Sequence, residues 1–475
     1  MQFEVLSQPD VEQIHNATLR VLDRTGSRIH CEQGRKLLAD AGCRIADDDL
    51  VKIPARLVEE CLKSVTKQFV VYDRLGNPAL KIEGRNCYFG TGVTNPNFLD
   101  IETGKVRPTR VSDIANAARV SDYLPNIDWI MPLGSVQDVP CEVSDVYEFE
   151  AAVNNTTKPI VFICNDLKGV ADVLEMAEVI AGGRAKLIER PFVISYPEPT
   201  SPLVHTQTAV EKLLFSADRG IPTVYTPCAM SGATAPVTMA GLLVQINAEC
   251  LAGLVLSQLK RKGTPFVIGG VLTIMDMAAT TMAYGAPEMS LLLAGCADLA
   301  RHYGLPTWGT AGCSDSKLPD EQAAIEATFS SLINALAGLN LVHDPGFLEG
   351  AKIGSLEMLV MTNEIAGMAK RFMKGIPVNR ETLAEDVIHR VGPGGHYLEQ
   401  EHTLRHFREE HWRPTLMDRH NYAIWLARGG KTMGQRIKEK VMDILLHHKP
   451  QPLPDDVRAK VRKIRERSER ERRSR

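Results

Sequence analysis

Short apolar runs alternate with longer helical patterns through most of this 475-residue chain. The runs are typical of buried β-strands, and the segments between them repeat apolar residues at helical spacing. This alternation predicts a parallel sheet, because each helix returns the chain to the edge where the next strand begins. The eight strand candidates are 87–91, 127–132, 159–164, 191–196, 222–226, 265–269, 306–310 and 340–343.

Eight strand–helix units predict an α/β fold, a closed (β/α)8 TIM barrel. An open doubly wound sheet is the rival arrangement, but no G-x-G-x-x-G motif opens any of the helices. The helical patterns that we expect to follow the strands are 112–124, 142–155, 168–182, 207–219, 237–260, 287–303, 320–337 and 354–374.

The two ends of the chain differ from this repeat. We expect a helical N-terminal segment at 1–80, the catalytic barrel at 81–395 and a helical C-terminal extension at 396–475. Within the first segment, helical spacing occurs at 10–24, 32–41 and 54–66, and a β-like run lies at 68–74.

The last 18 residues are dominated by Arg and Glu, a pattern typical of a solvated or frayed helix or of a subunit contact. The amphipathic tail favours a homo-oligomer. RNA binding by this tail is a minor alternative, and a net charge of -3 gives no reason to expect nucleic acid as a partner.

Ten cysteines are scattered singly, without C-x-x-C pairs, and the N-terminus does not resemble a signal peptide. No charge-free run reaches the roughly 18 apolar residues of a membrane span. The nearest run, 265–296, is interrupted by Gly, Pro, Asp276 and Glu288 and predicts a strand, a loop and a helix. We therefore expect a cytoplasmic protein that does not enter a membrane.

In a barrel of this kind, active-site residues follow the carboxyl ends of the strands. The polar residues at these positions are Asn165, Glu198, Asp315, Lys317 and His343, with Tyr88, Tyr196, Tyr225 and Phe347 as aromatic neighbours. No H-x-H, H-E-x-x-H or E-x-x-H motif occurs at the strand ends, so we expect no metal site.

Several of these residues also have ordinary structural interpretations. Lys317 could form a Schiff base, but Asp315 and Asp320 flank it and favour a salt-bridged lysine. Asp320 can equally cap the helix that follows, and His343 can equally be a buried structural histidine. Glu249 lies on a long apolar helix, where a carboxylate is either paired or functional.

Four blocks carry a resemblance to a known family: 196–259, which contains "SGATAPVTMAGLLVQINAECLAGLVLSQL", 315–327, 340–350 and 390–408. They resemble the trimethylamine methyltransferase (MttB) family, corrinoid-dependent enzymes built on a (β/α)8 barrel. The resemblance implies methyl transfer from an amine to the Co(I) centre of a partner corrinoid protein, as in methylamine metabolism and methanogenesis. It implies no cofactor bound to this chain, which acts on the partner's cobalamin.

Trimethylamine enzymes of this family carry a pyrrolysine near the region that matches 315–327, where this chain has only ordinary residues. The chain is therefore similar to the non-pyrrolysine members that act on glycine betaine. A quaternary ammonium leaves as a neutral amine, so it needs positioning rather than covalent activation.

With this resemblance, Tyr88 and Phe347 are expected to form the cation cage, and Glu198 and Asp315 to supply its negative charge. His343 is the expected anchor for the betaine carboxylate, and Gln322 supports it; no residue is expected to act covalently. Proline betaine, carnitine and γ-butyrobetaine stay open as donors. Two different functions also stay open: a Schiff-base aldolase that uses Lys317, and a non-catalytic betaine-binding or corrinoid-docking protein.

Overall fold

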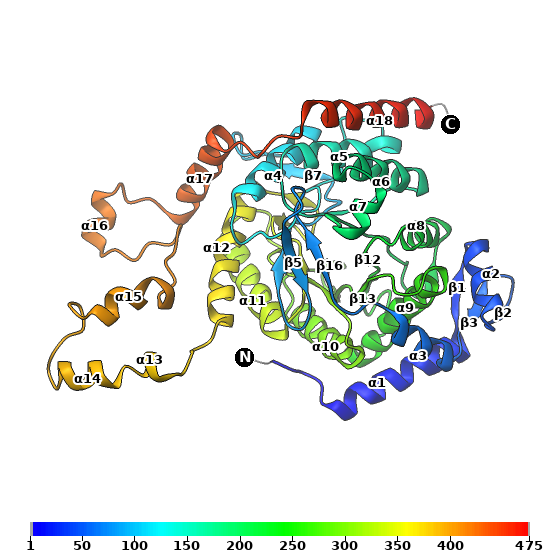
Figure 1. Ribbon diagram of the computed structural model, residues 1–475, viewed down its shortest axis with the longest axis horizontal. Coiled ribbons are helices and arrows are strands. Elements are labelled where there is room, and N and C mark those ends of the chain that lie inside the picture. Colours follow the sequence, from blue (N-terminus) through cyan, green and yellow to red (C-terminus); the bar gives the residue numbers. More distant parts are fainter. Residues whose placement is uncertain (1–2, 474–475) are drawn as a thin grey trace.

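A closed barrel of parallel strands forms the centre of the computed structural model, which describes residues 3–473 (Figure 1). Seven strands pair in the order β6-β18-β17-β14-β12-β10-β9. Parallel bridges from Gly90 to Trp129 and from Ile130 to Ile160 then insert residues 129–130 between β6 and β9 and close the ring. The regular strands are β6 (Tyr88–Phe89), β9 (Ile160–Phe162), β10 (Val193–Ser195), β12 (Thr223–Val224), β14 (Phe266–Gly269), β17 (Thr307–Thr310) and β18 (Leu341–His343).

The predicted (β/α)8 fold is confirmed, although the second predicted strand, 127–132, pairs only through the two isolated bridges. Each predicted barrel helix is present, and its start lies within two residues of the expected one. These helices are α4 (Val111–Tyr123), α5 (Ser144–Asn154), α6 (Leu167–Ala181), α8 (Gln207–Asp218), α9 (Met239–Lys260), α10 (Pro287–Tyr303), α11 (Glu321–Ala337) and α12 (Leu356–Met373). A 3-10 turn, Cys141–Val143, precedes α5, and a short helix, α7 (Arg184–Glu189), follows α6.

The helix α9 is long and apolar enough to span a membrane by length and composition. Most of its residues are buried inside the protein, where it packs against α8 and the N-terminal helices. A core helix has the same composition as a span, and the burial of α9 identifies it as a core helix.

A hairpin of β4 (Phe69–Tyr72) and β5 (Pro78–Ile82) closes the amino end of the barrel. Val71, Leu80 and Ile82 belong to the same buried cluster as Trp129 and Trp308, which fill the barrel interior. The site therefore lies at the opposite end, where the strands finish.

The N-terminal segment forms the three predicted helices, α1 (Gln8–Arg20), α2 (Glu32–Asp40) and α3 (Ala55–Ser64), which pack on α9. A π-helical turn, Val21–Thr25, follows α1. A small sheet that the sequence did not predict joins this segment to the barrel in the order β11-β1-β3-β2. Its strands are β1 (Ser27–Ile29), β2 (Arg44–Ala46), β3 (Leu50–Lys52) and β11 (Val204–His205).

Two further sheets surround the carboxyl end of the barrel. One joins β13 (Cys228–Ser231), β15 (Val271–Asp276) and β16 (Thr281–Ala283). The strand and the helix expected over 265–296 are confirmed as β14 and α10, but the expected loop was wrong, because β15 and β16 form a hairpin between them. The other sheet contains β7 (Asn97–Leu99), β8 (Val106–Pro108), β19 (Phe347–Leu348) and β20 (Ile353–Gly354).

The C-terminal helix α18 (Asp455–Arg473) packs on α5 and α6 of its own chain. Arg467 forms an ion pair with Asp172 (2.9 Å), and Arg472 with Asp145 (2.8 Å). It is not a frayed helix, because ion pairs and apolar contacts fix one of its faces to the barrel, and a subunit contact stays a prediction. The preceding helices are α13 (Arg380–Leu383), α14 (Glu385–Val391), α15 (Glu401–Glu410), α16 (Tyr422–Ala427) and α17 (Met433–His447). The division of the chain at residues 80 and 395 stays a prediction.

Candidate active site

A cavity of about 140 Å³ lies at the carboxyl end of the barrel. Its walls come mainly from residues that follow β6, β9, β10, β12, β14 and β18, as expected for an active site in this fold. The lining residues are Val93, Thr94, Ile163, Tyr196, Glu198, Cys228, Val271, Tyr284, His343, Asp344, Phe347 and Ala351.

His343 ends β18 and is buried beside Trp308, with ring centroids 4.6 Å apart. Its Nδ1 lies 2.7 Å from the Gly309 carbonyl oxygen, so Nδ1 carries the proton of the neutral ring. Burial lowers the pKa of His343 to about 4, which keeps the ring neutral at physiological pH. A neutral ring with this tautomer offers an accepting Nε2, so the geometry does not support His343 as a hydrogen-bond donor to a carboxylate.

Asp344 is the buried carboxyl group at the centre of this wall. Its Oδ1 lies 3.2 Å from His343 Nε2, and neither carboxyl oxygen has a hydrogen-bond partner among the described residues. Burial raises the pKa of Asp344 well above its usual value, because no cation or donor compensates the lost hydration. A ligand cation placed in the cavity would supply that missing charge.

Glu198 contributes a second carboxyl group from the loop after β10. Burial raises the pKa of this side chain, while Lys212 and the Tyr196 hydroxyl partly oppose the shift. The Tyr196 hydroxyl in turn accepts a hydrogen bond from Thr226 Oγ1 (3.1 Å), which fixes its ring. Two carboxyl groups therefore face one small cavity, and the described part of the chain places no Lys or Arg side chain in its lining.

Three aromatic residues, Tyr196, Tyr284 and Phe347, complete the cavity walls. Phe347 is fully buried, and the Tyr284 hydroxyl makes no hydrogen bond to any described residue. Aromatic faces attract cations through their quadrupole, most strongly where water is excluded. The site therefore combines the two kinds of group that stabilise a quaternary or protonated amine.

Asp315 acts one layer behind the cavity. Its carboxylate accepts hydrogen bonds from the backbone N–H groups of Tyr284 (2.8 Å) and Gly285 (2.7 Å). Glu326 supports this arrangement, because its Oε2 accepts from Ser314 Oγ (2.5 Å) and from the Asp315 N–H (2.9 Å). Asp315 thus positions the Tyr284 ring rather than lining the cavity.

The structure brings Glu198, His343 and Phe347 together, with Asp315 behind them, but it leaves two expected site residues elsewhere. Tyr88 begins β6 at the closed end of the barrel, where its hydroxyl accepts from the Lys81 N–H (3.1 Å). Gln322 is exposed in the first turn of α11 and donates to Glu326 Oε1 (2.8 Å).

The structure also shows the contacts of the residues for which the sequence allowed more than one interpretation. Lys317 is exposed and donates to the Asp315 carbonyl oxygen (2.9 Å), away from the cavity lining. Glu249 is buried and accepts from Ser201 Oγ (2.7 Å) and the Leu203 N–H (2.9 Å), so it holds the loop after β10. Asp320 caps α11 through the Ala323 N–H, as predicted.

Four lining residues with ionisable side chains were missing from the predicted site: Asp344, Tyr284, Cys228 and Tyr196, of which Tyr196 was expected only as an aromatic neighbour. Asp344 directly follows His343 at a strand end, so its position was a usable signal. Tyr284 follows the unpredicted β15–β16 hairpin, and nothing in the sequence places it at the barrel mouth.

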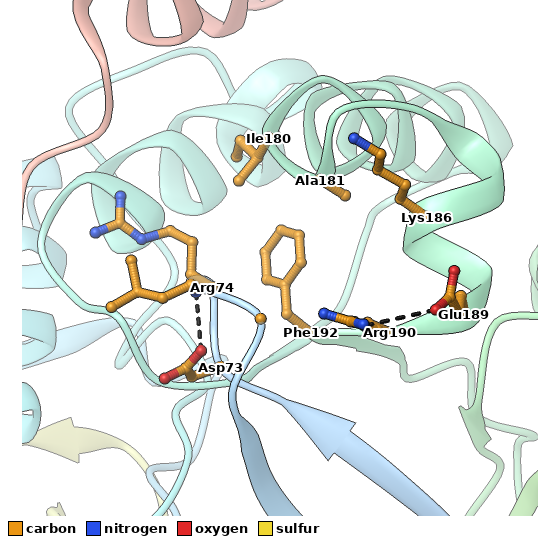
Figure 2. Close-up of a pocket in the computed structure, with 10 residues that line it drawn as sticks. Asp73, Arg74, Ile180, Ala181, Lys186, Glu189, Arg190 and Phe192 are labelled. Atoms are coloured by element: carbon orange, nitrogen blue, oxygen red, sulfur yellow. Dashed lines mark hydrogen bonds and ion pairs between the residues drawn. The ribbon is translucent and has the colours of Figure 1, made fainter.

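A larger cavity, of about 380 Å³, lies at the other end of the barrel beside the β4–β5 turn. Its charged side chains do not converge: in Figure 2, Ile180 and Phe192 lie between Arg74 and Lys186. The cavity at the carboxyl end of the barrel is therefore the better candidate for the active site.

Among residues 3–473, no group of three or more His, Cys, Asp or Glu side chains could hold a metal ion.

Comparisons with known proteins agree on one family. The family model described as trimethylamine methyltransferase (MTTB) matches residues 1–472. Trimethylamine methyltransferase MttB of Desulfitobacterium hafniense is 37% identical over 98% of this chain and 93% of its own length. A glycine betaine methyltransferase from another strain of that species is 30% identical over 97% of this chain and 96% of its own length.

A solved structure also resembles this fold. The monomethylamine methyltransferase MtmB of Methanosarcina barkeri covers 94% of this chain with a TM-score of 0.52, and 88% of that chain is covered in return. At 11% identity this likeness concerns the fold alone. The family match over nearly the whole sequence, together with these relatives, shows that the chain belongs to the trimethylamine methyltransferase family.

Proposed function

We propose that this protein transfers a methyl group from a quaternary amine to the Co(I) centre of a partner corrinoid protein, with glycine betaine as the first-choice donor. One observation carries the proposal: aromatic rings and buried carboxyl groups share a cavity whose described lining has no Lys or Arg. Such surroundings favour an organic cation, and a quaternary amine carries its positive charge at every pH.

The reaction needs little covalent assistance from the protein. Co(I) supplies the electron pair that forms the new cobalt–carbon bond, and the breaking C–N bond leaves its pair on nitrogen. The donor then departs as dimethylglycine, whose amine is neutral and whose carboxylate keeps its charge, and the metal becomes methyl-Co(III). A neutral trimethylamine would have to depart as an amide anion, so it needs prior activation.

The chain's own residues can hold the donor in line for this attack. Phe347, Tyr196 and Tyr284 enclose the N-methyl groups, and Asp344 and Glu198 balance the positive charge. The betaine carboxylate needs a donor, and the Tyr284 hydroxyl, which has no other partner in the described chain, is well placed for it. Orientation and exclusion of water are then the main contributions to the rate.

The composition of residues 315–327 supports a quaternary donor, because no pyrrolysine occurs there. Sequence identity does not separate the two donor classes, since relatives named for trimethylamine (37%) and for glycine betaine (30%) both match over almost the full length. The ten free cysteines suit a reducing, cytoplasmic setting, which is part of the proposal.

Isothermal titration calorimetry tests the proposed binding mode. Glycine betaine, proline betaine, carnitine, γ-butyrobetaine and trimethylamine are titrated separately into the full-length protein. At least one quaternary amine should bind, and more tightly than trimethylamine. Absence of binding by all four quaternary amines would contradict the proposal, whereas preference for a longer betaine would change only the first-choice donor.

A further inference from the structure

The loop 196–205 runs from the end of β10 through β11 and carries Glu198 into the candidate active site. Three of its ten residues are proline, which has no N–H group, so the loop has fewer backbone hydrogen bonds to donate than an ordinary segment. The position of the Glu198 carboxyl group therefore depends on side chains that neighbouring elements supply to this loop.

Glu249 supplies such support from the middle of α9. Its side chain is fully buried, and Oε2 accepts a hydrogen bond from Ser201 Oγ (2.7 Å) while Oε1 accepts one from the Leu203 N–H (2.9 Å). Gln245, one helical turn earlier, donates from Nε2 to the same Oε1 (3.0 Å). Burial of a carboxyl group costs free energy, and here two of the three donors that offset this cost belong to the loop.

The backbone of Leu203 shows why the loop needs an acceptor at this point. Its φ angle is +56°, in the left-handed region that residues with a side chain rarely adopt. The Leu203 N–H donates to Glu249, and its carbonyl oxygen accepts from the Arg28 N–H in β1 (2.9 Å). A conformation of this kind persists only where surrounding contacts enforce it, and these contacts act five residues after Glu198.

The same face of α9 makes a second attachment, at the far end of the loop. A Cβ on Gly253 would lie 2.2 Å from Tyr225 Cδ1, so glycine is what lets this ring pack against the helix. The Tyr225 hydroxyl lies 2.7 Å from Nδ1 of the buried His205, which ends β11. Gln245, Glu249 and Gly253 recur every four residues, so a single stripe of α9 holds the loop.

We propose that Glu249 is a positioning residue of the active site, which holds the loop 196–205 so that the Glu198 carboxylate faces the substrate cation. The inference rests on the proposed function, because it takes Glu198 as a group that balances a quaternary ammonium. Glu249 itself lies outside the cavity lining, so it acts on the substrate only through the loop. Its effect on ligand affinity should therefore depend on the presence of Glu198.

A buried polar residue elsewhere on α9 provides a matched control for general stability. Asn247 is also buried, and it donates from Nδ2 to Thr18 Oγ1 (3.1 Å) and to the Tyr303 hydroxyl (2.8 Å). These contacts join α9 to α1 and α10, and neither reaches the loop 196–205. Asn247→Leu therefore removes a buried hydrogen-bonding group from the same helix without touching the proposed positioning contacts.

A double-mutant cycle on the full-length protein tests the proposal by calorimetry, with tetramethylammonium as the probe. Glu249→Ala and Glu198→Gln should each lower the affinity at least about fivefold, and the double variant should bind within about twofold of Glu198→Gln alone. Glu249→Gln, which keeps an acceptor for the Leu203 N–H, and Asn247→Leu should both bind like wild type. Losses that simply multiply in the double variant, or an equal loss in Asn247→Leu, would overturn the positioning role. Unchanged affinity in Glu198→Gln alone would instead contradict the proposed function.

Hydrogen–deuterium exchange tests the same contacts without a ligand. Glu249→Ala should speed exchange of the backbone amides at 203–205, whereas Asn247→Leu should leave them at the wild-type rate. Ser201→Ala removes a single hydrogen bond, so it replaces Glu249→Ala in both experiments if that variant does not fold. Wild-type exchange at 203–205 in the Glu249 or Ser201 variant would overturn the proposal even if ligand affinity falls.

Discussion

His343 Nε2 lies 3.2 Å from Asp344 Oδ1, and burial shifts the pKa values of the two residues in opposite directions. The histidine pKa falls to about 4, so the ring stays neutral, and the aspartate pKa rises because its charge has no partner. A cation in the cavity would favour the ionised form of Asp344 beside the neutral His343 ring. This relationship leads to the first two predictions.

Binding of a quaternary ammonium should strengthen as the pH rises. Tetramethylammonium does not titrate, so any dependence comes from the protein, where Asp344 and Glu198 have raised pKa values and must lose protons to balance the ligand. Below the pKa of one such group, affinity should increase up to about tenfold per pH unit. Calorimetry from pH 5 to pH 9 measures this, and a flat or falling affinity would contradict it.

Removal of the Asp344 charge should weaken binding of the ammonium group. Asp344→Asn keeps the side-chain shape but cannot become negative, and we expect an affinity for glycine betaine at least about tenfold lower, about 1.4 kcal/mol. The pH dependence should also become shallower, leaving only the Glu198 contribution. Glu349→Gln is the matched control, since this carboxylate lies five residues along the same loop but outside the cavity lining. Equal losses in both variants would show that the effect is not specific to the cavity.

Asp315 should affect both stability and turnover through Tyr284. Asp315→Asn removes a charged acceptor from the N–H groups of Tyr284 and Gly285, which costs about 1.5–3 kcal/mol of unfolding free energy. Turnover should also fall, because the Tyr284 ring loses its fixed position. Asp320→Asn serves as the control, because asparagine caps a helix as well as aspartate does. Urea unfolding measures the loss of unfolding free energy, and kcat/KM measures the loss of turnover. Both losses should occur in Asp315→Asn and neither in Asp320→Asn.

Gly92 should tolerate no side chain. A Cβ there would overlap the Asp344 carboxylate and lie 2.5 Å from the Phe347 ring, so Gly92→Ala should destabilise the fold by about 1–3 kcal/mol and abolish ligand binding. Gly434→Ala, in α17, meets nothing closer than Thr432 Oγ1 at 4.0 Å and should be neutral or stabilising by about 0.5–1 kcal/mol. Thermal unfolding and calorimetry of the pair measure the difference. Normal binding by the Gly92 variant would contradict the described cavity.

The barrel and part of the site follow from sequence periodicity. Residues after predicted strands, such as Glu198, His343 and Phe347, reach the cavity because parallel strands all end at one face. Tyr88 does not, because it begins its strand and so lies at the closed end.

Tertiary structure decides the remaining site residues. Tyr284 reaches the cavity through an inserted hairpin and through the Asp315 carboxylate, and neither produces a sequence periodicity. The missing hydrogen-bond partners of Asp344 likewise appear only once neighbouring loops are packed around it.

The most direct test follows free cob(I)alamin by its visible spectrum in the presence of the purified protein. We predict that glycine betaine yields methyl-Co(III) and dimethylglycine, while trimethylamine at the same concentration gives no more product than a protein-free control. Methyl-Co(III) formed from trimethylamine but not from any quaternary amine would contradict the proposed donor class. Tight binding of glycine betaine without any methyl-Co(III) would contradict the proposed catalysis.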